Sequence, residues 1–489
     1  MRHNRSIISV LCQYSSLGQD FFNCVVKVYA KMNPFLLITL LIGTQIGLSD
    51  GLVLPVLAAK HGQGSFLIVY AFTKLIFILP ILQAELVAGR IYRASPFELS
   101  FLALNKRLAA VLLSLLVMAL IFVLASNLFN TAWTMIYSID GVSGKLLGLR
   151  PLDQNLYWFE QSQNTNRIMS FVIAQGIFLM LLGGLAWRGI ISVFQFFVPI
   201  CAVFILISLP KIAELMTVLQ YPALSWNDIF VAIQHSITSS LAGLLIWYVI
   251  GTKVSDQLPT GRAIIAVQLF DVLFGLALLS ISYQWLDALS ADYLEVGTVF
   301  RLLMASLSNV EAVPMYTMLW LIVLPVVGVL SSVPLLLLLT QQLGSIIRHW
   351  LLALTTLAVV ILSGALVLSN GVYSPIVWYG RPLYDVVQAL GQGLIIPLIT
   401  GGVSFWVGWV MVPNQVLRQI NPHGGIRYFL WRLVLRFVVP VLLGVIFART
   451  TLTLTSFTPT QVLVFCLLAI VGVRLFTWVK KRAIFPSYD

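Results

Sequence analysis

The fold of this chain is decided by residues 43–64, which read GTQIGLSDGLVLPVLAAKHGQG. The stretch lies in a hydrophobic run, yet it contains several glycines, a proline at position 55 and a single carboxylate, Asp50, near its middle. A charged side chain in the bilayer core costs roughly 3 kcal/mol on insertion scales. Irregular backbone at that depth is tolerated only where it is buried in protein or lines a cavity. An interrupted membrane helix with an acid at the interruption therefore indicates a binding site.

Composition agrees with a membrane protein of many spans. The 489 residues are 60% hydrophobic and 9% charged, and the mean hydropathy is +0.97. Such values exclude a soluble globular domain. A helix needs roughly 20 apolar residues to cross a bilayer core about 30 Å thick. Runs of this kind predict an all-α integral membrane protein with twelve transmembrane helices, at 34–59, 65–90, 108–137, 168–187, 190–209, 228–251, 262–288, 315–344, 350–369, 384–411, 428–448 and 457–479.

Lysine and arginine are distributed unevenly between the two sets of connections. The set that includes the N-terminal residues 1–33 is much richer in them than the set that includes the long loops 138–167 and 289–314. The positive-inside rule therefore places both termini in the cytoplasm and accounts for most of the net charge of +12. We expect residues 1–33 to be a cytoplasmic tail, because they lack the apolar core and cleavage site of a signal peptide. No basic patch on a soluble face is visible, so we expect no nucleic-acid partner.

The sixth predicted span is also unusual. Residues 227–251 read NDIFVAIQHSITSSLAGLLIWYVIG, and hydroxyl and amide side chains crowd positions 234–240. Such side chains offer the backbone alternative hydrogen-bond partners, and Ala242 with Gly243 can absorb an unwound turn. Paired interruptions in two halves are typical of an inverted-repeat transporter with a site at the membrane midplane. The alternative is that these hydroxyl groups only join helices by hydrogen bonds.

At these residues the chain resembles the neurotransmitter:sodium symporter family, including its bacterial leucine-transporter type. The match runs without gaps from Gly43 to Arg90, and it rests on Gly43, Gly47, Leu48, Pro55, Ala58, Ala59, Gly62, Gly64, Phe66, Tyr70, Pro80, Glu85, Gly89 and Arg90. Weaker matches follow at Trp133, Thr134, Arg188, Gly189, Gln234, Thr238, Ser240, Gly328, Ser331, Ser332 and Asp385. The resemblance implies a leucine-transporter-type fold, which is a 5+5 inverted repeat in which helices 1 and 6 are broken.

The resemblance also implies a substrate pocket and two sodium sites. The pocket would consist of Thr44, Gln45, Gly47, Val123, Asn127, Ile237, Ser240 and Ala242. The sodium sites would draw on Asp50, Thr238, Gln268 and the backbone near Gln45, and on Gly43, Ile46 and Ser331. Free N–H groups of the half-helix beside Gly47 would face a substrate carboxylate. Glu85 would accept N–H groups from the unwound part of span six.

Four positions that couple, clamp or gate depart from the family's chemistry. Asp50 stands where the family has asparagine, and Asn127 where it has a tyrosine that binds the substrate carboxylate. Leu330 replaces a hydroxyl or acid of the second sodium site. The outer-gate arginine is Val53, which leaves its partner position, Asp385, without that counter-ion.

Three roles are open to Asp50. The first is a charged sodium ligand, since hard cations prefer oxygen. The second is a protonation site for proton coupling, and the third is the partner of an amine-bearing substrate. Two other polar residues of the spans have open roles as well. His235 is either a packed neutral side chain or part of a proton relay. Lys74 pairs with an acid such as Asp271, snorkels to the interface, or takes part in transport.

We therefore expect a secondary active transporter, a symporter that moves a small amino-acid-like or amine solute by alternating access and is driven by sodium. The alternatives are proton coupling, and a channel or transport-inactive sensor on the same fold. Scattered histidines, with no P-loop and no G-x-S-x-G motif in the sequence, argue against an enzyme.

The expected organisation has three parts. A ten-helix transport core at 34–411 follows the tail, and two additional helices with a short cytoplasmic C-terminal tail occupy 412–489. The expected partners are the solute and the lipid bilayer, and the expected cofactor is a sodium ion. The resemblance implies the plasma membrane, which is the inner membrane of a bacterium.

Overall fold

The computed structural model of the protein describes residues 34–94, 96, 106–184, 186–255, 261–286, 298–308, 310–341, 345–369, 377–378, 381–420 and 425–454. The predicted tail at 1–33 and the predicted twelfth span at 457–479 lie outside the described residues. Within them, nearly all regular structure is helical.

The described elements follow one another along the chain without a soluble domain between them. In order they are α3 (Pro34–Gln45), α4 (Leu48–Lys60), α5 (Gln63–Thr73), the π-helical turn η1 (Lys74–Ile78), α6 (Leu79–Tyr92), α8 (Lys106–Val142), α9 (Pro151–Gln163), α10 (Thr165–Gly184), α11 (Ala186–Val218), α12 (Trp226–Ser239), α13 (Ile246–Gly251), α14 (Gly261–Leu286), α15 (Thr298–Leu307), α16 (Met315–Gln341), α17 (Ser345–Ser369), β1 (Val377–Trp378), β2 (Arg381–Pro382), α18 (Leu383–Gln388), η3 (Ala389–Ile395), α19 (Ile396–Phe405), η4 (Trp406–Val410), α20 (Pro413–Ile420), α21 (Ile426–Leu433), η5 (Val434–Val438) and α22 (Val439–Leu454). The two short strands pair antiparallel.

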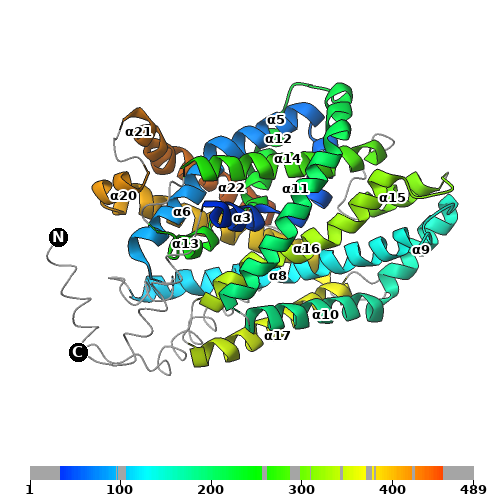
Figure 1. The fold of residues 1–489 in the computed structure, drawn as a ribbon, viewed down its shortest axis with the longest axis horizontal. Coiled ribbons are helices and arrows are strands. Elements are labelled where there is room, and N and C mark those ends of the chain that lie inside the picture. Colours follow the sequence, from blue (N-terminus) through cyan, green and yellow to red (C-terminus); the bar gives the residue numbers. More distant parts are fainter. Residues whose placement is uncertain are drawn as a thin grey trace.

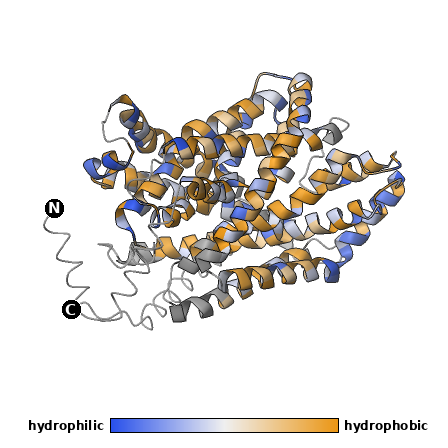
Figure 2. Ribbon diagram, viewed as in Figure 1, coloured by the Kyte–Doolittle hydropathy of each residue, from blue (hydrophilic) through white to orange (hydrophobic). Residues whose placement is uncertain are grey.

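The chain is an integral membrane protein with many apolar spans. In the described part, eight helices are long and apolar enough to cross a membrane, and the pair α3 and α4, bent by 52°, makes a ninth. A shorter apolar helix covers Ala353–Leu368. The predicted span at 228–251 is divided between α12 and α13. Figure 2 shows hydrophobic residues along the spans and hydrophilic ones at the two ends of the bundle, in α9 and α20.

The first interrupted helix lies inside the bundle, where other helices surround it. Both α3 and α4 pack against α14, and α3 also contacts α11 and α16. The long helix α8 packs against α16, α17 and α10. Figure 1 shows α3 near the centre of the view, with α8, α10 and α17 forming one layer. This packing buries the irregular backbone that follows α3.

Glycines let α6 and α13 approach each other very closely. A Cβ atom at Gly89 would collide with the carbonyl of Tyr248, and one at Gly251 would collide with the carbonyl of Leu86. Small residues of this kind commonly allow membrane helices to pack backbone against backbone. The absence of side chains at Gly89 and Gly251 therefore lets the six-residue helix α13 lie directly against α6.

The two long predicted loops contain helices at one end of the bundle. Figure 1 shows α9 and α15 together at that end and α20 at the opposite end. The Asp140 carboxylate at the end of α8 accepts hydrogen bonds from Tyr157 of α9 at 2.6 Å and from Arg167 of α10 at 2.7 Å and 2.9 Å. Burial, together with the Asp140 carboxylate, raises the pKa of the Tyr157 hydroxyl. This network ties the α9 segment to both neighbouring spans.

Candidate functional site

The first interruption lies between Gln45, the last residue of α3, and Leu48, the first of α4. Gly47 is in an extended conformation with φ −128° and ψ 145°, so the helical hydrogen-bond ladder stops before it. The first N–H groups of any helix have no partner within that helix. The start of α4 therefore presents free N–H groups, and the positive end of its dipole, to the middle of the bundle.

The second interruption separates α12, which ends at Ser239, from α13, which begins at Ile246. Leu241, Gly243 and Leu245 all have positive φ, at 50°, 90° and 59°. Residues other than glycine rarely adopt this backbone conformation, so the surrounding structure must hold it in place. Here the fully buried Glu85 carboxylate accepts the Gly243 N–H at 2.7 Å.

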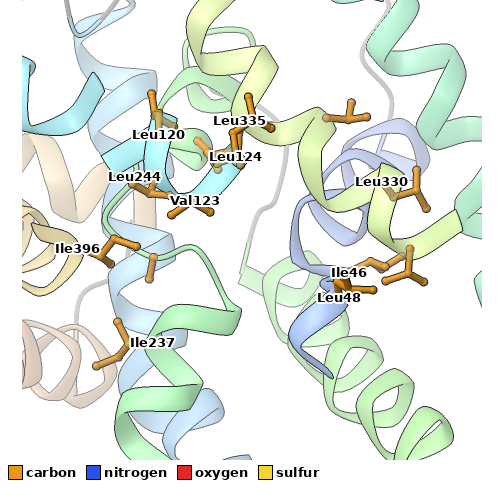
Figure 3. Close-up of a cluster of buried hydrophobic side chains, with 14 of the residues drawn as sticks. Ile46, Leu48, Leu120, Val123, Leu124, Ile237, Leu244, Leu330, Leu335 and Ile396 are labelled. Atoms are coloured by element: carbon orange, nitrogen blue, oxygen red, sulfur yellow. The ribbon is translucent and has the colours of Figure 1, made fainter. Parts of the chain in front are cut away.

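A cavity of about 320 Å³ lies where these two interruptions meet α8, α16 and the α18–η3 segment. Its wall is formed by Gln45, Ile46, Gly47, Leu48, Ser49, Leu52, Val53, Val123, Asn127, Asn130, His235, Thr238, Ser239, Leu241, Ser331, Tyr384, Gln388 and Gln392. The volume is in the range of small-molecule sites. Figure 3 shows Ile46, Leu48, Val123 and Leu330 in a cluster of buried hydrophobic residues.

Carboxamides and hydroxyl groups make up most of the polar part of this wall. The carboxamides are Gln45, Asn127, Asn130, Gln388 and Gln392, and none of the described lining residues is Asp, Glu, Lys or Arg. A carboxamide both donates and accepts hydrogen bonds without carrying a charge. The cavity therefore suits a polar solute of zero net charge.

Tyr384 joins two sides of the cavity through neutral hydrogen bonds. Its hydroxyl oxygen accepts from Asn130 Nδ2 of α8 at 2.9 Å and from Gln388 Nε2 at 2.9 Å. Val53, the predicted outer-gate position, is half-buried in the same wall. Asp385 belongs to α18, and its side chain lies outside the described part of the structure.

A chain of amide groups connects the first interruption to α12 and α14. Gln268 Nε2 donates to Gln45 Oε1 at 3.2 Å, and Gln45 Nε2 donates to the Ser240 carbonyl at 3.2 Å. Gln268 Oε1 is buried and has no hydrogen-bond partner among the described residues. An oxygen acceptor is therefore left available beside the end of α3.

Asp50 is fully buried immediately behind the cavity wall. Its Oδ1 accepts a hydrogen bond from the Tyr70 hydroxyl at 3.1 Å, and its Oδ2 accepts none from a described side chain. The Tyr70 ring lies 5.5 Å from the His235 ring. Lys74, one turn after Tyr70, is fully buried and forms an ion pair with Asp271 of α14. The structure thus shows Lys74 paired with Asp271 and not extended to the membrane interface.

Apart from Asp385, the predicted site residues fall into two groups. Those that line the cavity are Gln45, Ile46, Gly47, Val53, Val123, Asn127, Thr238 and Ser331. Those that lie outside its wall are Gly43, Thr44, Asp50, Glu85, Ile237, Ser240, Ala242 and Gln268.

Several residues outside the wall support it from behind. Thr44 Oγ1 accepts a hydrogen bond from Trp247 Nε1 at 2.9 Å. The Ala242 carbonyl accepts one from Thr400 Oγ1 at 2.9 Å. Gly43 faces the ring of Phe194, which occupies the place where a side chain would be.

Ten wall residues were not among the predicted site residues, and four of them lie on α8 and the α18–η3 segment, namely Asn130, Tyr384, Gln388 and Gln392. A signal for three of them exists in the sequence, because positions 384, 388 and 392 are spaced by four and share one face of a helix in an apolar span. Asn130 follows Asn127 by one turn of α8 and faces the same way.

The oxygen atoms present fit a sodium ion better at one predicted site than at the other. Sodium, like calcium and magnesium, is a hard cation that takes oxygen ligands. At the first site, Asp50 Oδ2 and Gln268 Oε1 are buried oxygens without a side-chain partner. At the second site, Ser331 Oγ donates to the Gly328 carbonyl at 2.8 Å, and the fully buried Leu330 contributes no side-chain oxygen.

Comparison by sequence gives no relatives, whereas comparison by fold does. No protein-family model matches the sequence, and no curated protein matches it. The crystal structure of MhsT in complex with L-phenylalanine is similar, with a TM-score of 0.73 over 85% of this chain and 98% of that chain, at 18% sequence identity. The chain therefore shares the fold of MhsT, and the predicted all-helical membrane fold is confirmed at that level.

Proposed function

We propose that this protein is a secondary active transporter, a divergent member of the neurotransmitter:sodium symporter family, which moves a small amino-acid-like or amine solute by alternating access. The observation that carries the proposal is the polar cavity enclosed between the first interruption, at Ile46 and Gly47, and the second, at residues 240–245. The shared fold with MhsT, which was crystallised with L-phenylalanine, supports it.

The lining of the cavity favours a zwitterionic solute over one with a net charge. A carboxylate group would meet the free N–H groups at the start of α4. The carboxamides and hydroxyl groups of the wall would satisfy the remaining polar atoms of the solute. A net cation would meet no carboxylate among the described side chains of the wall, because Asp50 lies behind it.

Sodium is the coupling ion that the residues support best. The first site would use Asp50, Gln268 and Thr238 with backbone oxygens near Gln45, and the second would use Gly43, Ile46 and Ser331. A bound sodium ion would supply positive charge beside Asp50, and its gradient would drive accumulation of the solute. Proton coupling remains the alternative for the same carboxylate.

The proposed architecture is the complete family arrangement. It has twelve transmembrane helices, with α3–α4 and α12–α13 as the broken first and sixth helices of a 5+5 inverted repeat. The transport core occupies 34–411, and both termini lie in the cytoplasm. The location is the plasma membrane, the inner membrane of a bacterium.

The proposal is tested first by identifying the solute and then by measuring its uptake. A thermal-shift screen of amino acids and amines, in sodium and in potassium and at acidic and neutral pH, selects the solute. Uptake into proteoliposomes should then saturate, and should exceed equilibrium only with an inward sodium gradient. Flux without accumulation would indicate a channel, and binding without flux a sensor. Accumulation driven by a proton gradient in the absence of sodium would show that the coupling ion is the proton.

Asp50→Asn is the first informative variant. We expect it to abolish ion coupling, or to change the ion that is used, because it removes the buried negative charge while keeping the shape of the side chain. Asp153→Asn on the exposed face of α9 makes the same substitution away from the site and should leave uptake unchanged. Uptake by Asp50→Asn with unaltered dependence on sodium and pH would contradict our account of the site.

A further inference from the structure

Lys74 has an unusual environment for a lysine in a membrane span. Its side chain is fully buried, and it pairs with Asp271, whose side chain is 1% exposed. Lys74 also begins the π-helical turn η1, in which the Leu79 N–H donates to the Lys74 carbonyl. Ionisable groups within spans and single π-helical turns both occur frequently at functional sites.

The pair is not isolated, because Asp50 lies next to it. The Tyr70 side chain lies beside both Asp50 and Lys74. Its hydroxyl donates to Asp50 Oδ1 at 3.1 Å, and its ring centre lies 5.1 Å from Lys74 Nζ. On α14, Gly275 lies one turn after Asp271, and a Cβ atom there would be 3.7 Å from the Asp50 Cβ. One buried cluster, which we call the charge cluster, thus contains Asp50, Tyr70, Lys74 and Asp271.

The formal charges of the charge cluster do not balance. Two carboxylates and one ammonium leave a net charge of −1. Asp50 Oδ2 and Asp271 Oδ1 accept no hydrogen bond from a described side chain. A buried charge without compensation is strongly unfavourable. The cluster therefore requires one further monovalent cation, either a proton or a metal ion.

The position of the ammonium decides where that cation binds. While Asp271 holds Lys74, the Asp50 carboxylate has only the Tyr70 hydroxyl as a side-chain partner. Without the Asp271 charge, the ammonium would be drawn to Asp50 as the remaining carboxylate beside it. The flexible stem of lysine allows such a change of partner.

We propose that the Lys74–Asp271 pair sets the cation requirement of the site: Asp271 retains the Lys74 ammonium, and so leaves Asp50 free to bind one sodium ion. This inference rests on the proposed function in taking sodium as the ion at Asp50. Lys74 and Asp271 are positioning residues, since they act through Asp50.

A series of variants that changes the cluster charge step by step tests the proposal. Asp50→Asn and Asp271→Asn each bring the net charge to zero, whereas Lys74→Met with Asp271→Asn restores −1. Binding of radioactive sodium to the purified full chain in detergent is the measurement. We expect each single variant to lose one sodium equivalent and the double variant to regain it. A purely structural pair would not give this recovery when a second charged residue is removed.

Two controls accompany the series. Glu214→Gln breaks the partly exposed Lys211–Glu214 pair, whose atoms are 2.7 Å apart, and should leave sodium binding unchanged. Melting temperatures in choline chloride report folding without sodium. If Asp271→Asn does not fold, Lys74→Met takes its place: its net charge of −2 should give tighter sodium binding than that of the unmodified chain.

The outcomes separate this inference from the proposed function. Full sodium binding by Asp271→Asn, no recovery in the double variant, or unchanged binding by Lys74→Met would overturn the role of the pair. An unmodified chain that binds no sodium would overturn it too. The expected binding pattern in a protein that moves no solute would leave the pair's role intact and reject transport.

Discussion

Gly243 is the residue at which the second interruption is most tightly constrained. Its φ is 90°, and a Cβ atom there would collide with the Thr400 side chain. The Thr400 hydroxyl binds the neighbouring Ala242 carbonyl, while Glu85 binds the Gly243 N–H. Backbone conformation, close packing and two hydrogen bonds all meet at one position, so only glycine satisfies them together.

Replacing Gly243 with alanine should destabilise the protein in two separable ways. The left-handed backbone costs an alanine about 1–2 kcal/mol, and the collision with Thr400 adds roughly 1–3 kcal/mol of overpacking. Gly148→Ala isolates the first effect, because Gly148 has φ 65° and a methyl group there would meet nothing within 4 Å. Thermal melting of both purified variants is the measurement. Equal losses for the two would show that packing at Thr400 contributes nothing.

At the scale of elements, the close crossing of α6 and α13 determines where the second half of span six lies. Trp247 of α13 donates to Thr44 Oγ1 at 2.9 Å, so the position of α13 is transmitted to the end of α3. The crossing depends on Gly89 and Gly251 having no side chains.

Gly89→Ala should separate the two helices and lower stability by about 1–3 kcal/mol, because the methyl group has no space beside the Tyr248 carbonyl. Gly444→Ala in α22 is the matched control, since nothing lies within 4 Å of that position. The control should be neutral, or stabilising by up to about 1 kcal/mol through helix propensity. Melting curves in detergent compare the two, and a Gly89→Ala protein as stable as the control would argue against the crossing.

At the scale of the whole molecule, helices of the predicted outer loops and of a predicted inner connection lie at opposite ends of the bundle. The helices of the predicted outer loops, α9 and α15, lie together at one end, and α20, from a predicted inner connection, lies at the other. The basic residues Arg418 and Arg427 both belong to this predicted inner connection.

Cysteine labelling should reveal this orientation directly. In a background without the four native cysteines, Asp153→Cys in α9 should react with a membrane-impermeant maleimide on intact cells. Asn414→Cys in α20 should react only after permeabilisation, because the positive-inside rule places α20 in the cytoplasm. Both side chains are exposed, so accessibility of the residue itself does not limit the reaction. Labelling of Asn414→Cys on intact cells would reverse the proposed topology.

Local signals in the sequence were enough to predict the first interruption and its surroundings. Glycines around a lone acid mark the end of α3, and an acid on α14 was available to Lys74. Both predictions need only the local sequence pattern and the free-energy cost of burying a charge in the membrane.

The second interruption was harder to anticipate in detail. Ile237 and Ala242 were expected in the cavity, whereas Leu241 lines it instead. The positive φ values at 241, 243 and 245 turn the side chains in directions that helical periodicity does not describe. Tyr384 and its neighbours were missed for another reason, since long-range packing brings span ten to the wall.

The bond of the Tyr384 hydroxyl to Asn130 and Gln388 has a consequence for measurements in salt. Attraction between exposed charges weakens as ionic strength rises, with a screening length of about 10 Å at 0.1 M and 3 Å at 1 M. A contact between a phenol and two carboxamides carries no net charge, so added salt leaves its strength nearly unchanged. In a salt titration of this protein, the contact that joins α8 to α18 therefore keeps its strength while ions bind.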